Sequence, residues 1–477
     1  MVIRTRAICI SVVLAVAILM AAPVISQTTD DPFPEPIEAV DGVITVDFVE
    51  FAAIPDIDGQ AARVMILVDE PGTGRMFVND MRGPIYTVSY DGGTVTHFVD
   101  IDADDFGVSV NSGGRERGMQ SFAMHPQFGQ SGTPGYGRFY TWSDTSNLAP
   151  QPDFVAGGDG NTHDTVLLEW TSRTPAGPTY DGGAPREIMR FEQPFGNHNG
   201  GQIGFNPFAS PGDSDFGMLF VGIADGGSGG DPLSLAQNLG VGFGKIMRID
   251  PLGSDSENGE YGIPSDNPFA DDGDDNTLGE IYAYGARNPQ RFAWDPQNGN
   301  MFFSDIGQNI VEEMGLVTSG ANLGWSDWEG SFEFISRSEV GLANQQGDPG
   351  VTYPVAEYGQ IDPLLQSQSA ATGLHVYRDG AIPQLANLVL FGDMPSGEIF
   401  YVDADNLPTG GQDAIRRILL NDGGEAKTLL QLVQDKNREQ GRELSTRADL
   451  RYGSGPAGQV LIMSKGDGMI RLLVPDQ

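Results

Sequence analysis

The feature that most constrains the fold of this chain is a unit that recurs six times along the sequence. Each copy contains apolar, strand-like runs separated by short turns rich in Gly, Pro or Asp. The first copy shows the pattern clearly, with runs at 65–68, 75–78 and 84–88. The other copies begin near residues 122, 202, 281, 388 and 449. A strand meander repeated in this way is typical of architectures in which each unit stacks on its neighbours.

Six copies predict an all-β fold, a six-bladed β-propeller of antiparallel four-stranded blades. The alternating run at 43–49 is expected to complete the last blade, which would close the ring and remove exposed edges. The alternative is a β-sandwich with long insertions, which does not explain a sixfold recurrence. Gly (65 residues) and Pro (31) are abundant and long helical periodicities are scarce, as expected for an all-β chain. The long gap at 325–373 is expected to be a loop over the blade ends.

The fourth copy carries the densest group of polar residues at strand ends. Its run at 281–284 leads into Arg287, and its run at 301–304 leads into Asp305. We expect the two runs to form a strand pair that delivers both polar groups to the blade end, where binding residues usually lie. On this window alone, a surface salt bridge is as well supported as a functional site.

The N-terminal sequence has the features of a secretory signal peptide at 1–26. A basic start precedes an almost wholly apolar run at 7–22, and small residues follow. An uncleaved anchor is the alternative, but the run is short for a membrane span. Residues 27–42 are polar and Pro-rich and are expected to be flexible, and 43–477 would form the propeller domain. The mature chain is therefore expected to be periplasmic or secreted, without stable membrane insertion.

Charge and cysteine content exclude several functions. The formal net charge is −38 and the chain has only four lysines, so nucleic acid, which needs a basic patch, is not an expected partner. The single cysteine, Cys9, lies in the predicted signal peptide, so the mature chain has neither disulfides nor thiol chemistry. An acidic, lysine-poor surface is compatible with a salty habitat or with bound divalent cations.

Among the five histidines, His198 is the strongest candidate for acid–base chemistry. It lies in the polar, Gly-rich loop 197–201 before a strand, and histidine exchanges protons near neutral pH. Asp225 directly follows the next strand, so its carboxylate could orient the imidazole. Arg287 could supply a fixed positive charge to an oxygen that becomes anionic. This set fits proton abstraction coupled to hydride or to acyl chemistry, and the residues alone leave both open. A lone loop histidine is otherwise more often structural.

Several motifs, in order along the chain, resemble the glucose/sorbosone dehydrogenase family, the soluble quinoprotein aldose dehydrogenases that use pyrroloquinoline quinone (PQQ) and Ca²⁺. The resemblance extends over roughly 62–474. The motifs include Glu116-Arg117-Gly118-Met119-Gln120, His198-Asn199-Gly200-Gly201, Tyr284-Gly285-Ala286-Arg287-Asn288-Pro289-Gln290, Asp305-Ile306-Gly307-Gln308, Asn322-Leu323-Gly324-Trp325 and Arg447-Ala448-Asp449-Leu450-Arg451-Tyr452-Gly453. The resemblance also implies a six-bladed propeller, in agreement with the repeats.

The resemblance implies a role for each candidate residue. His198 looks like the base that takes the proton of a sugar's anomeric hydroxyl, Asp225 like its partner, and Arg287 like the group that steadies the oxyanion. The residues that would contact PQQ are Glu116, Asn288, Arg447 and Arg451, of which the arginines suit its carboxylates. The Ca²⁺ ligands would be backbone carbonyls of Gly307 and Gln308. Pro395 stands where the glucose-oxidising branch has a cofactor-binding lysine, and Glu116 stands where it has a glutamine.

The implied function is that of an exported, PQQ- and Ca²⁺-dependent oxidoreductase. It would oxidise an aldose or related polyhydroxy substrate at the anomeric carbon and pass electrons to an external acceptor. The alternative is a non-catalytic propeller that binds a glycan or a protein partner, since one fold supports both. A propeller hydrolase such as a lactonase would need a metal held by side-chain carboxylates at the ring centre, and the sequence shows no clear set.

Overall fold

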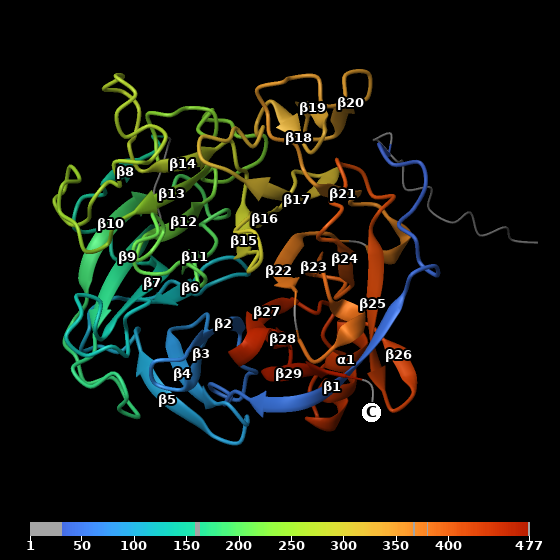
Figure 1. The fold of residues 1–477 in the computed structure, drawn as a ribbon, viewed down its shortest axis with the longest axis horizontal. Helices are drawn as coiled ribbons and strands as arrows, with labels where there is room; N and C mark the ends of the chain where they lie inside the picture. The colour runs from blue at the N-terminus through green and yellow to red at the C-terminus, as the bar shows by residue number, and fades with distance from the viewer. Residues whose placement is uncertain (1–30, 158–162, 366–367, 379, 476–477) are drawn as a thin grey trace, which may run out of the picture.

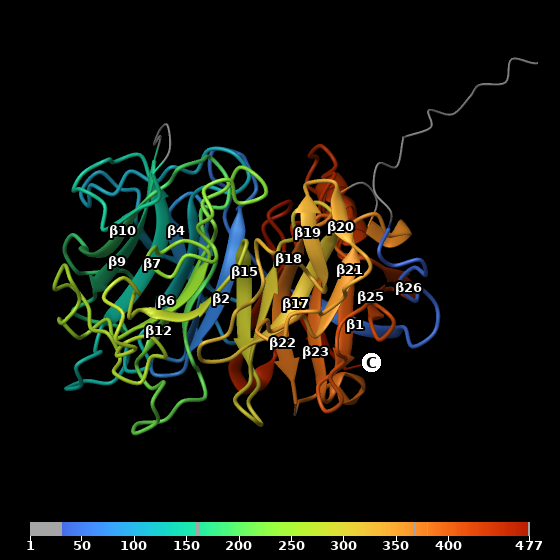
Figure 2. The ribbon, with the colours of Figure 1, turned by 90° about the horizontal axis from the view of Figure 1, so that it is seen from above.

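Six four-stranded blades surround a central axis in the computed structural model of this chain, which describes residues 31–157, 163–365, 368–378 and 380–475 (Figure 1). The predicted six-bladed propeller is confirmed. In the view turned by 90°, β2 (Val64–Glu70) and β15 (Pro289–Trp294) run along the axis (Figure 2). The first strand of each blade lies innermost, because the first strands contact one another around the ring. The predicted signal peptide lies outside the described residues.

The first three blades are antiparallel meanders in chain order. Blade one is β2, β3 (Arg75–Asp80), β4 (Pro84–Ser89) and β5 (Val95–Asp100). Blade two is β6 (Met119–Met124), β7 (Arg138–Thr145), β9 (Asp164–Thr171) and β10 (Arg186–Glu192), with β8 (Phe154–Val155) paired to β10. Blade three is β11 (Ile203–Phe205), β12 (Leu219–Ile223), β13 (Lys245–Ile249) and β14 (Ile281–Tyr284).

The last three blades repeat this order. Blade four is β15, β16 (Met301–Asp305), β17 (Val311–Val317) and β21 (Ala356–Gly359). Blade five is β22 (Ala371–Tyr377), β23 (Leu388–Asp393), β24 (Ile399–Asp403) and β25 (Arg416–Asp422), extended by β26 (Glu425–Lys427). Blade six is β27 (Arg451–Ser454), β28 (Val460–Met463), β29 (Met469–Val474) and β1 (Ile44–Ala53).

The N-terminal strand closes the ring, as predicted. Strand β1 pairs antiparallel with β29, with Phe48 opposite Leu473, and so completes blade six. It also pairs in parallel with β25 of blade five, with Ile44 opposite Ile418. Pairing the two ends of the chain in one blade removes a sheet edge and ties the ring together.

A separate apolar cluster fills each interface between successive blades. Successive side chains of a strand point to opposite faces, so each blade contributes to two clusters. In β16, Phe302 packs against blade five and its neighbour Phe303 against blade three. Both rings are buried, and replacing such a ring by alanine typically costs about 3–5 kcal/mol.

The expected pairing of 281–284 with 301–304 is wrong. The first run is β14, the outer strand of blade three, and pairs with β13, with Lys245 opposite Tyr284. The partner of β16 is β15, with Phe292 opposite Phe303. Strand β15 begins Pro-Gln-Arg and lines the axis, so it lacks the apolar pattern of a strand. Arg287 therefore lies in the loop that crosses from blade three to blade four.

The expected loop at 325–373 contains more structure than predicted. Its last residues enter β22, the innermost strand of blade five. A small sheet of β18 (Trp328–Glu329), β19 (Phe332–Ser336) and β20 (Glu339–Gly341) lies at the rim of the molecule beside blade four (Figure 1). These strands are too short to show a clear alternation in the sequence.

The chain also contains an α-helix, α1 (Leu429–Glu439), which was not predicted. Thr428 caps it in a capping box with Gln431, and Leu429 and Val433 are among its buried residues. Three single 3₁₀ turns complete the described helical structure: Pro363–Leu365, Pro383–Leu385 and Pro456–Gly458. None of the helices in the described ranges is both long and apolar enough to span a bilayer.

Residues 31–43 of the N-terminal segment contain neither helix nor strand. They lie against the propeller nonetheless, because Ile37 is buried and its N–H donates to Asp362 Oδ2 at 2.7 Å. Gln412 donates to the carbonyl of Glu35 at 2.6 Å. These contacts hold the segment that precedes β1 against blades four and five.

Candidate active site

All predicted site residues lie at one face of the propeller. Some lie in loops that enter an innermost strand, namely Glu116, His198, Arg287, Asn288 and Arg447, and Arg451 begins such a strand. The others follow the second strand of a blade, namely Asp225, Gly307 and Gln308. The first and second strands of each blade are antiparallel, so the start of one and the end of the other meet at the same face.

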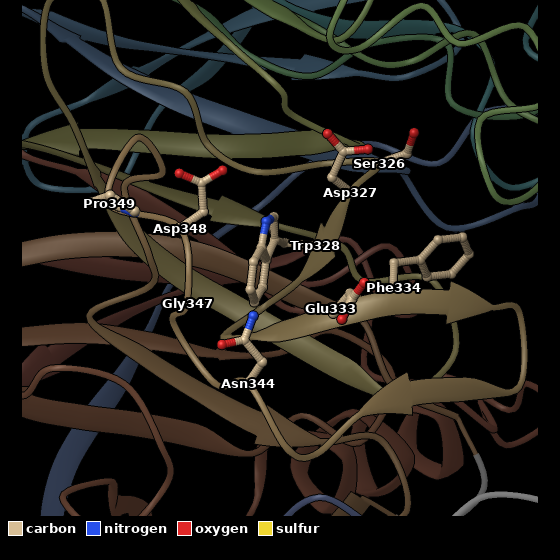
Figure 3. Close-up of a pocket in the computed structure, with 9 residues that line it drawn as sticks. All are labelled: Ser326, Asp327, Trp328, Glu333, Phe334, Asn344, Gly347, Asp348 and Pro349. Atoms are coloured by element: carbon tan, nitrogen blue, oxygen red, sulfur yellow. The ribbon is translucent and has the colours of Figure 1, made fainter.

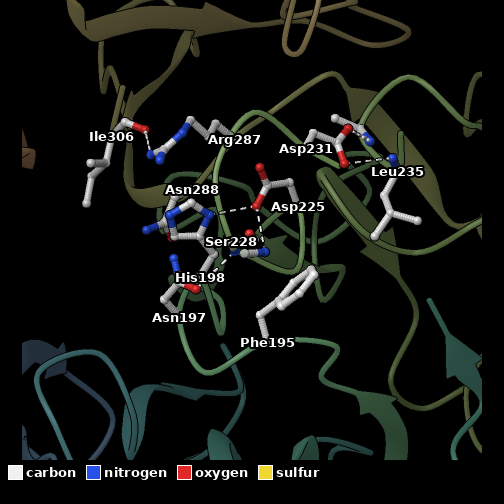
Figure 4. Close-up of polar contacts among 12 residues, drawn as sticks. Phe195, Asn197, His198, Asp225, Ser228, Asp231, Leu235, Arg287, Asn288 and Ile306 are labelled. Atoms are coloured by element: carbon white, nitrogen blue, oxygen red, sulfur yellow. Dashed lines mark hydrogen bonds and ion pairs between the residues drawn. The ribbon is translucent and has the colours of Figure 1, made fainter. Parts of the chain in front are cut away.

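His198 and Asp225 form a buried pair (Figure 4). His198 Nδ1 lies 2.6 Å from Asp225 Oδ1, and the indole N–H of Trp325 donates to Asp225 Oδ2 at 2.9 Å. A carboxylate beside Nδ1 favours the tautomer that carries its proton there, which leaves Nε2 as a proton acceptor. Nε2 has no hydrogen bond to any described residue. This is the geometry of a general base with an orienting carboxylate.

Asp225 stays ionised despite its burial. Burial by itself would raise the pKa of this carboxyl group, but the charges of His198 and Arg287 and the hydrogen bonds to His198 and Gly227 outweigh it and lower the pKa. An ionised partner stabilises an imidazolium as it forms and holds the ring in one orientation.

The backbone around His198 is held in an unusual conformation. His198 has φ +57°, a left-handed value that is uncommon for residues other than glycine. Glu116 Oε2 accepts the His198 N–H at 2.9 Å, so this exposed carboxylate fixes the loop. A Cβ on Gly227 would lie 2.3 Å from the Asn197 carbonyl oxygen, so only glycine lets the Asp225 loop approach so closely. Strained backbone of this kind often occurs at functional sites.

Arg287 does not form a salt bridge with Asp305. The Asp305 carboxylate instead accepts the backbone N–H groups of Arg287 (2.7 Å) and Asn288 (2.5 Å). The Arg287 guanidinium donates to the Ile306 carbonyl at 2.6 Å and to Gln308 Oε1 at 3.3 Å, and lies 5.5 Å from the ring centre of Trp325. Its charge is therefore positioned by neutral groups and is available to an anionic oxygen.

The loop after β16 has the features of a backbone calcium site. The carbonyl oxygens of Gly307 and Gln308 accept no hydrogen bond within the described chain. Glu329 Oε1 accepts four successive N–H groups, those of residues 308–311, at 2.8–3.0 Å, while its Oε2 is buried without a partner. A Cβ on Gly307 would lie 1.5 Å from the Val311 carbonyl oxygen. Free carbonyls beside a carboxylate oxygen suit Ca²⁺.

A side-chain metal centre is not formed in the described ranges, where no group of three or more His, Cys, Asp or Glu residues could hold a metal ion. The loop at Gly307 and Gln308 is a candidate of a different kind, since its ligands would be main-chain oxygens.

Arg447 and Arg451 lie apart from the His198 pair, at blade six. Arg447 donates to Gln368 Oε1 (2.6 Å) and to Asp449 Oδ1 (3.0 and 3.1 Å). Arg451 is buried and donates to the carbonyl of Leu450 at 2.8 Å. Within the described residues, no hydrogen bond or ion pair joins either arginine to His198 or Asp225. Arg447 is half-buried and so remains the better placed of the two to meet a ligand at this face.

Lys465 adds a cation that sequence reasoning missed. It follows β28, the second strand of blade six, and therefore lies at the same face. Burial by itself would raise the pKa of the Asp449 carboxyl group. The positive charges of Lys465, Arg447 and Arg451 outweigh burial and lower this pKa. The chain has only four lysines, and this scarcity was the one sequence signal that could have singled out Lys465.

Pro395 lies next to Arg447, since its carbonyl accepts the N–H of Ala448 at 2.8 Å. This position supplies no cationic side chain to the face.

Trp325 and Glu329 were also missed as individual contributors. The tryptophan was noted only as part of a motif, and its bond to Asp225 spans 100 positions in the sequence. A recess of about 460 Å³ adjoins it, formed by the small rim sheet and lined by residues that include Asp327, Trp328, Phe334 and Asp348 (Figure 3). The Phe334 ring lies 4.8 Å from the Trp325 ring, so this wall of the recess contacts the partner of Asp225.

Comparison with known proteins identifies the family of this chain. The sequence profile described as Glucose / Sorbosone dehydrogenase matches residues 65–423. The chain belongs to the glucose/sorbosone dehydrogenase family. The resemblance identified from the motifs is confirmed, and the family includes PQQ-dependent sugar dehydrogenases.

Family members of different kinds are similar to this chain. HIPL1 protein of Arabidopsis thaliana is 33% identical over 311 residues, covering 58% of this chain and 43% of HIPL1. Aldose sugar dehydrogenase YliI of Escherichia coli is 25% identical over 297 residues, covering 56% of this chain and 71% of YliI. The PQQ-bound structure of aldose sugar dehydrogenase from Streptomyces coelicolor has the same fold, with TM-score 0.54, 19% identity and coverage of 89% and 96%. The chain thus spans less than half the length of HIPL1.

Proposed function

We propose that this protein is a PQQ- and Ca²⁺-dependent dehydrogenase that oxidises an aldose or a related polyhydroxy compound at the anomeric carbon. The observation that carries the proposal is the His198–Asp225 pair, whose Nε2 is the free end of an oriented imidazole. Membership of the glucose/sorbosone dehydrogenase family supports the reaction class. The free carbonyls of Gly307 and Gln308 support the metal.

In the proposed reaction, His198 Nε2 accepts the proton of the anomeric hydroxyl. Asp225 holds the Nδ1–H and stabilises the imidazolium that results. Arg287 stabilises the sugar oxygen as negative charge develops on it, with its guanidinium fixed by the Ile306 carbonyl. Loss of a hydride from the anomeric carbon completes a two-electron oxidation to the lactone.

When bound, PQQ supplies the quinone that accepts the hydride, and Ca²⁺ supplies a Lewis acid that polarises it. We propose that Gly307 and Gln308 hold the metal through their carbonyls and that Asn288 lies against the cofactor. Arg447 would pair with a cofactor carboxylate, and Lys465 would partly replace the cation missing at Pro395. A trianionic cofactor needs such cations in a chain with net charge −38.

We also propose that the protein is exported after removal of residues 1–26 and acts in the periplasm or outside the cell. The basic start and apolar run of the sequence support this proposal. The electrons would then pass to an external acceptor. Sequencing the N-terminus of the mature protein from fractionated cells tests the export: a start near residue 27 is expected, and a cytoplasmic full-length chain would contradict it.

The enzymatic proposal is tested by reconstitution. Purified protein is incubated with PQQ and CaCl₂, cofactor binding is followed by fluorescence titration, and dye reduction is measured with a panel of aldoses. We expect saturable PQQ binding that requires Ca²⁺ and dye reduction with at least one aldose. An absence of PQQ binding at micromolar concentration would instead support the alternative of a non-catalytic propeller that binds a glycan or a protein. EDTA-treated protein without added Ca²⁺ is the control.

A further inference from the structure

Arg291 crosses the axis of the propeller. It is the third residue of β15, the innermost strand of blade four, and its guanidinium NH2 donates to the carbonyl of Met65 at 3.2 Å. Met65 lies on β2, the innermost strand of blade one. Blades one and four lie opposite each other in the ring (Figure 1). The bond to Met65 therefore carries the Arg291 side chain across the axis. Arg291 is 3% exposed.

Arg451 begins the innermost strand of blade six and lies beside the same axis. It is 1% exposed, and its guanidinium donates to the Leu450 carbonyl at 2.8 Å and to Thr372 Oγ1 at 3.4 Å. Thr372 belongs to β22, the innermost strand of blade five, so this group also lies among the axial strands. Arg451 is close enough to Arg291 for burial and the Arg451 charge together to lower the Arg291 pKa well below its usual value.

Neither guanidinium forms an ion pair with any described residue. Among the residues that the structure describes, no carboxylate lies within 4.0 Å of a nitrogen of Arg291 or Arg451. The Nε of each is buried and has no hydrogen-bond partner. Other buried arginines do form ion pairs with carboxylates: Arg378 contacts Asp295 at 2.5 Å and Arg190 contacts Asp164 at 2.8 Å.

Two uncompensated positive charges in the interior are costly, and arginine does not relieve the cost by losing its proton. Lys465, whose pKa is lowered by burial and by the charges of Arg451, Arg63 and Arg291, adds to the excess at this end of the channel. Asp449 is the carboxylate that acts on both Lys465 and Arg451, and one of its oxygens is already shared with Arg447. Positive charges therefore outnumber negative ones along this part of the axis.

We propose that Arg291 and Arg451 bind a small monovalent anion, such as chloride, on the axis of the propeller. The family resemblance assigns Arg451 to the cofactor, but its guanidinium is buried and bonded to Leu450 and Thr372. Arg291 lies three residues along the chain from Asn288, which corresponds to about 10 Å in an extended strand. Without PQQ, the site would still be occupied, so the inference does not depend on the proposed function.

The remaining donors define the chemistry of the ligand. The other N–H groups of the two arginines donate in part to backbone carbonyls, and each Nε–H has no acceptor. A halide accepts N–H groups from any direction and carries the single charge needed to reduce the repulsion between the arginines. PQQ, with three carboxylates, would require charged groups spread over a larger surface.

Crystals of the full-length mature protein grown without PQQ and soaked in sodium bromide test this inference. We expect one anomalous bromine peak on the axis, within hydrogen-bonding distance of both Arg291 and Arg451. Only water between the two guanidinium groups, with bromide confined to the surface, would overturn it.

A stability assay tests the same site in solution. Thermal unfolding of PQQ-free protein is compared in sodium chloride and sodium gluconate at equal ionic strength. At about 100-fold above the dissociation constant, chloride should raise the melting temperature by roughly 3 °C relative to gluconate. The difference should disappear in Arg291→Met and in Arg451→Met, so one folded variant is sufficient for the test.

Arg417→Met is the matched control, because Arg417 already pairs with Glu398 at 2.9 Å and should keep the chloride response. An equal chloride response in the wild type and in either axial variant would overturn the inference. Failure of PQQ titration would leave both anion measurements unaffected, so the two proposals fail independently.

Discussion

The two ends of the candidate site handle charge in opposite ways. At blades three and four, His198, Asp225 and Arg287 are buried, and each is held by partners in fixed directions. At blade six, Arg447 and Asp449 are half-buried, with side chains 20% and 25% exposed, and pair chiefly with each other. The end at blades three and four holds its side chains in fixed orientations. The end at blade six gathers an excess of positive charge.

This difference separates two requirements of the proposed chemistry. Proton abstraction needs an imidazole in one tautomer at one position, which the buried carboxylate and the strained loop provide. Binding a polyanion needs positive charge more than exact position, so a lost cation at one place can be offset by another nearby. Changes at the first end should therefore affect turnover, and changes at the second should affect cofactor affinity.

The largest effect is expected for His198→Ala. Removal of the proton acceptor should lower kcat by at least about 1,000-fold, because general base catalysis is lost. PQQ affinity should change little, since the base does not hold the cofactor. Steady-state dye reduction measures the first and fluorescence titration the second. His97→Ala, a change at an exposed histidine, is the control and should leave both unchanged. Full activity of His198→Ala would show that the base lies elsewhere.

Asp225→Asn should lower kcat by about 100- to 1,000-fold, because the amide no longer stabilises the imidazolium and permits the wrong tautomer. The melting temperature and the PQQ affinity distinguish this from a loss of structure, and both should stay near the wild-type values. A variant with wild-type kcat would argue against the orienting role. Trp325→Phe should show the same changes to a smaller degree, as it removes one bond to Asp225.

Gly307→Ala should reduce both stability and calcium affinity. The added Cβ would lie 1.5 Å from the Val311 carbonyl, so the loop after β16 must move. We expect a loss of about 2 kcal/mol in the free energy of unfolding, measured by urea denaturation in EDTA. Calcium titration should show weaker binding. Gly183→Ala is the matched control, because a Cβ there meets nothing within 4 Å. Unchanged calcium binding in folded Gly307→Ala would exclude this loop as the metal site.

Arg447→Met should raise the dissociation constant of PQQ by about 10- to 100-fold, the usual effect of removing one charged hydrogen bond. At saturating PQQ, kcat should stay near the wild-type value. Asp449→Asn should have the opposite effect and tighten PQQ, since it removes a negative charge from the same place. Arg438→Met, a change at an exposed helix residue, is the control. A fall in kcat without a change in affinity would contradict the division between the two ends.

The last prediction concerns the buried histidines away from the site, which affect stability and leave the chemistry unchanged. Burial lowers the pKa of His375 to about 4 and, with the charge of Arg138, that of His125 to about 4. The unfolded chain takes up these protons near pH 6.5, whereas the folded chain does so only near pH 4. Stability is thus fully present above pH 6.5 and lost as pH falls toward 4, by about 1.4 kcal/mol per pH unit for each histidine. Urea denaturation between pH 7.5 and 5 measures the slope, which His375→Gln should reduce.

Much of the fold was predictable because side-chain alternation survives wherever a strand packs between two blades. Phe302 and Phe303 face different blades and so appear as consecutive apolar residues flanked by turns. The innermost strands gave poorer signals. Strand β15 is an innermost strand, and its Pro289 and Arg291 interrupt the apolar pattern that would have revealed it. The result was the wrong partner for 281–284.

The residues of the candidate site were predictable where they lie directly before or after a strand. His198 and Asp225 each adjoin a strand of blade three, and the structure brings them to 2.6 Å. Trp325 and Glu329 were not predictable as partners, because their contacts depend on how the chain folds back between β17 and β21. Lys465 reaches the same face because it follows β28, the second strand of blade six.

The most direct test of the proposed function is a single turnover without an external acceptor. Wild-type protein carrying PQQ and Ca²⁺ is mixed rapidly with a reactive aldose, and the absorbance of the bound quinone is followed. Oxidation at the anomeric carbon predicts loss of the oxidised spectrum in proportion to bound PQQ, with one lactone formed per cofactor. Bound PQQ that stays oxidised with every aldose in the panel would contradict the assignment as a sugar dehydrogenase.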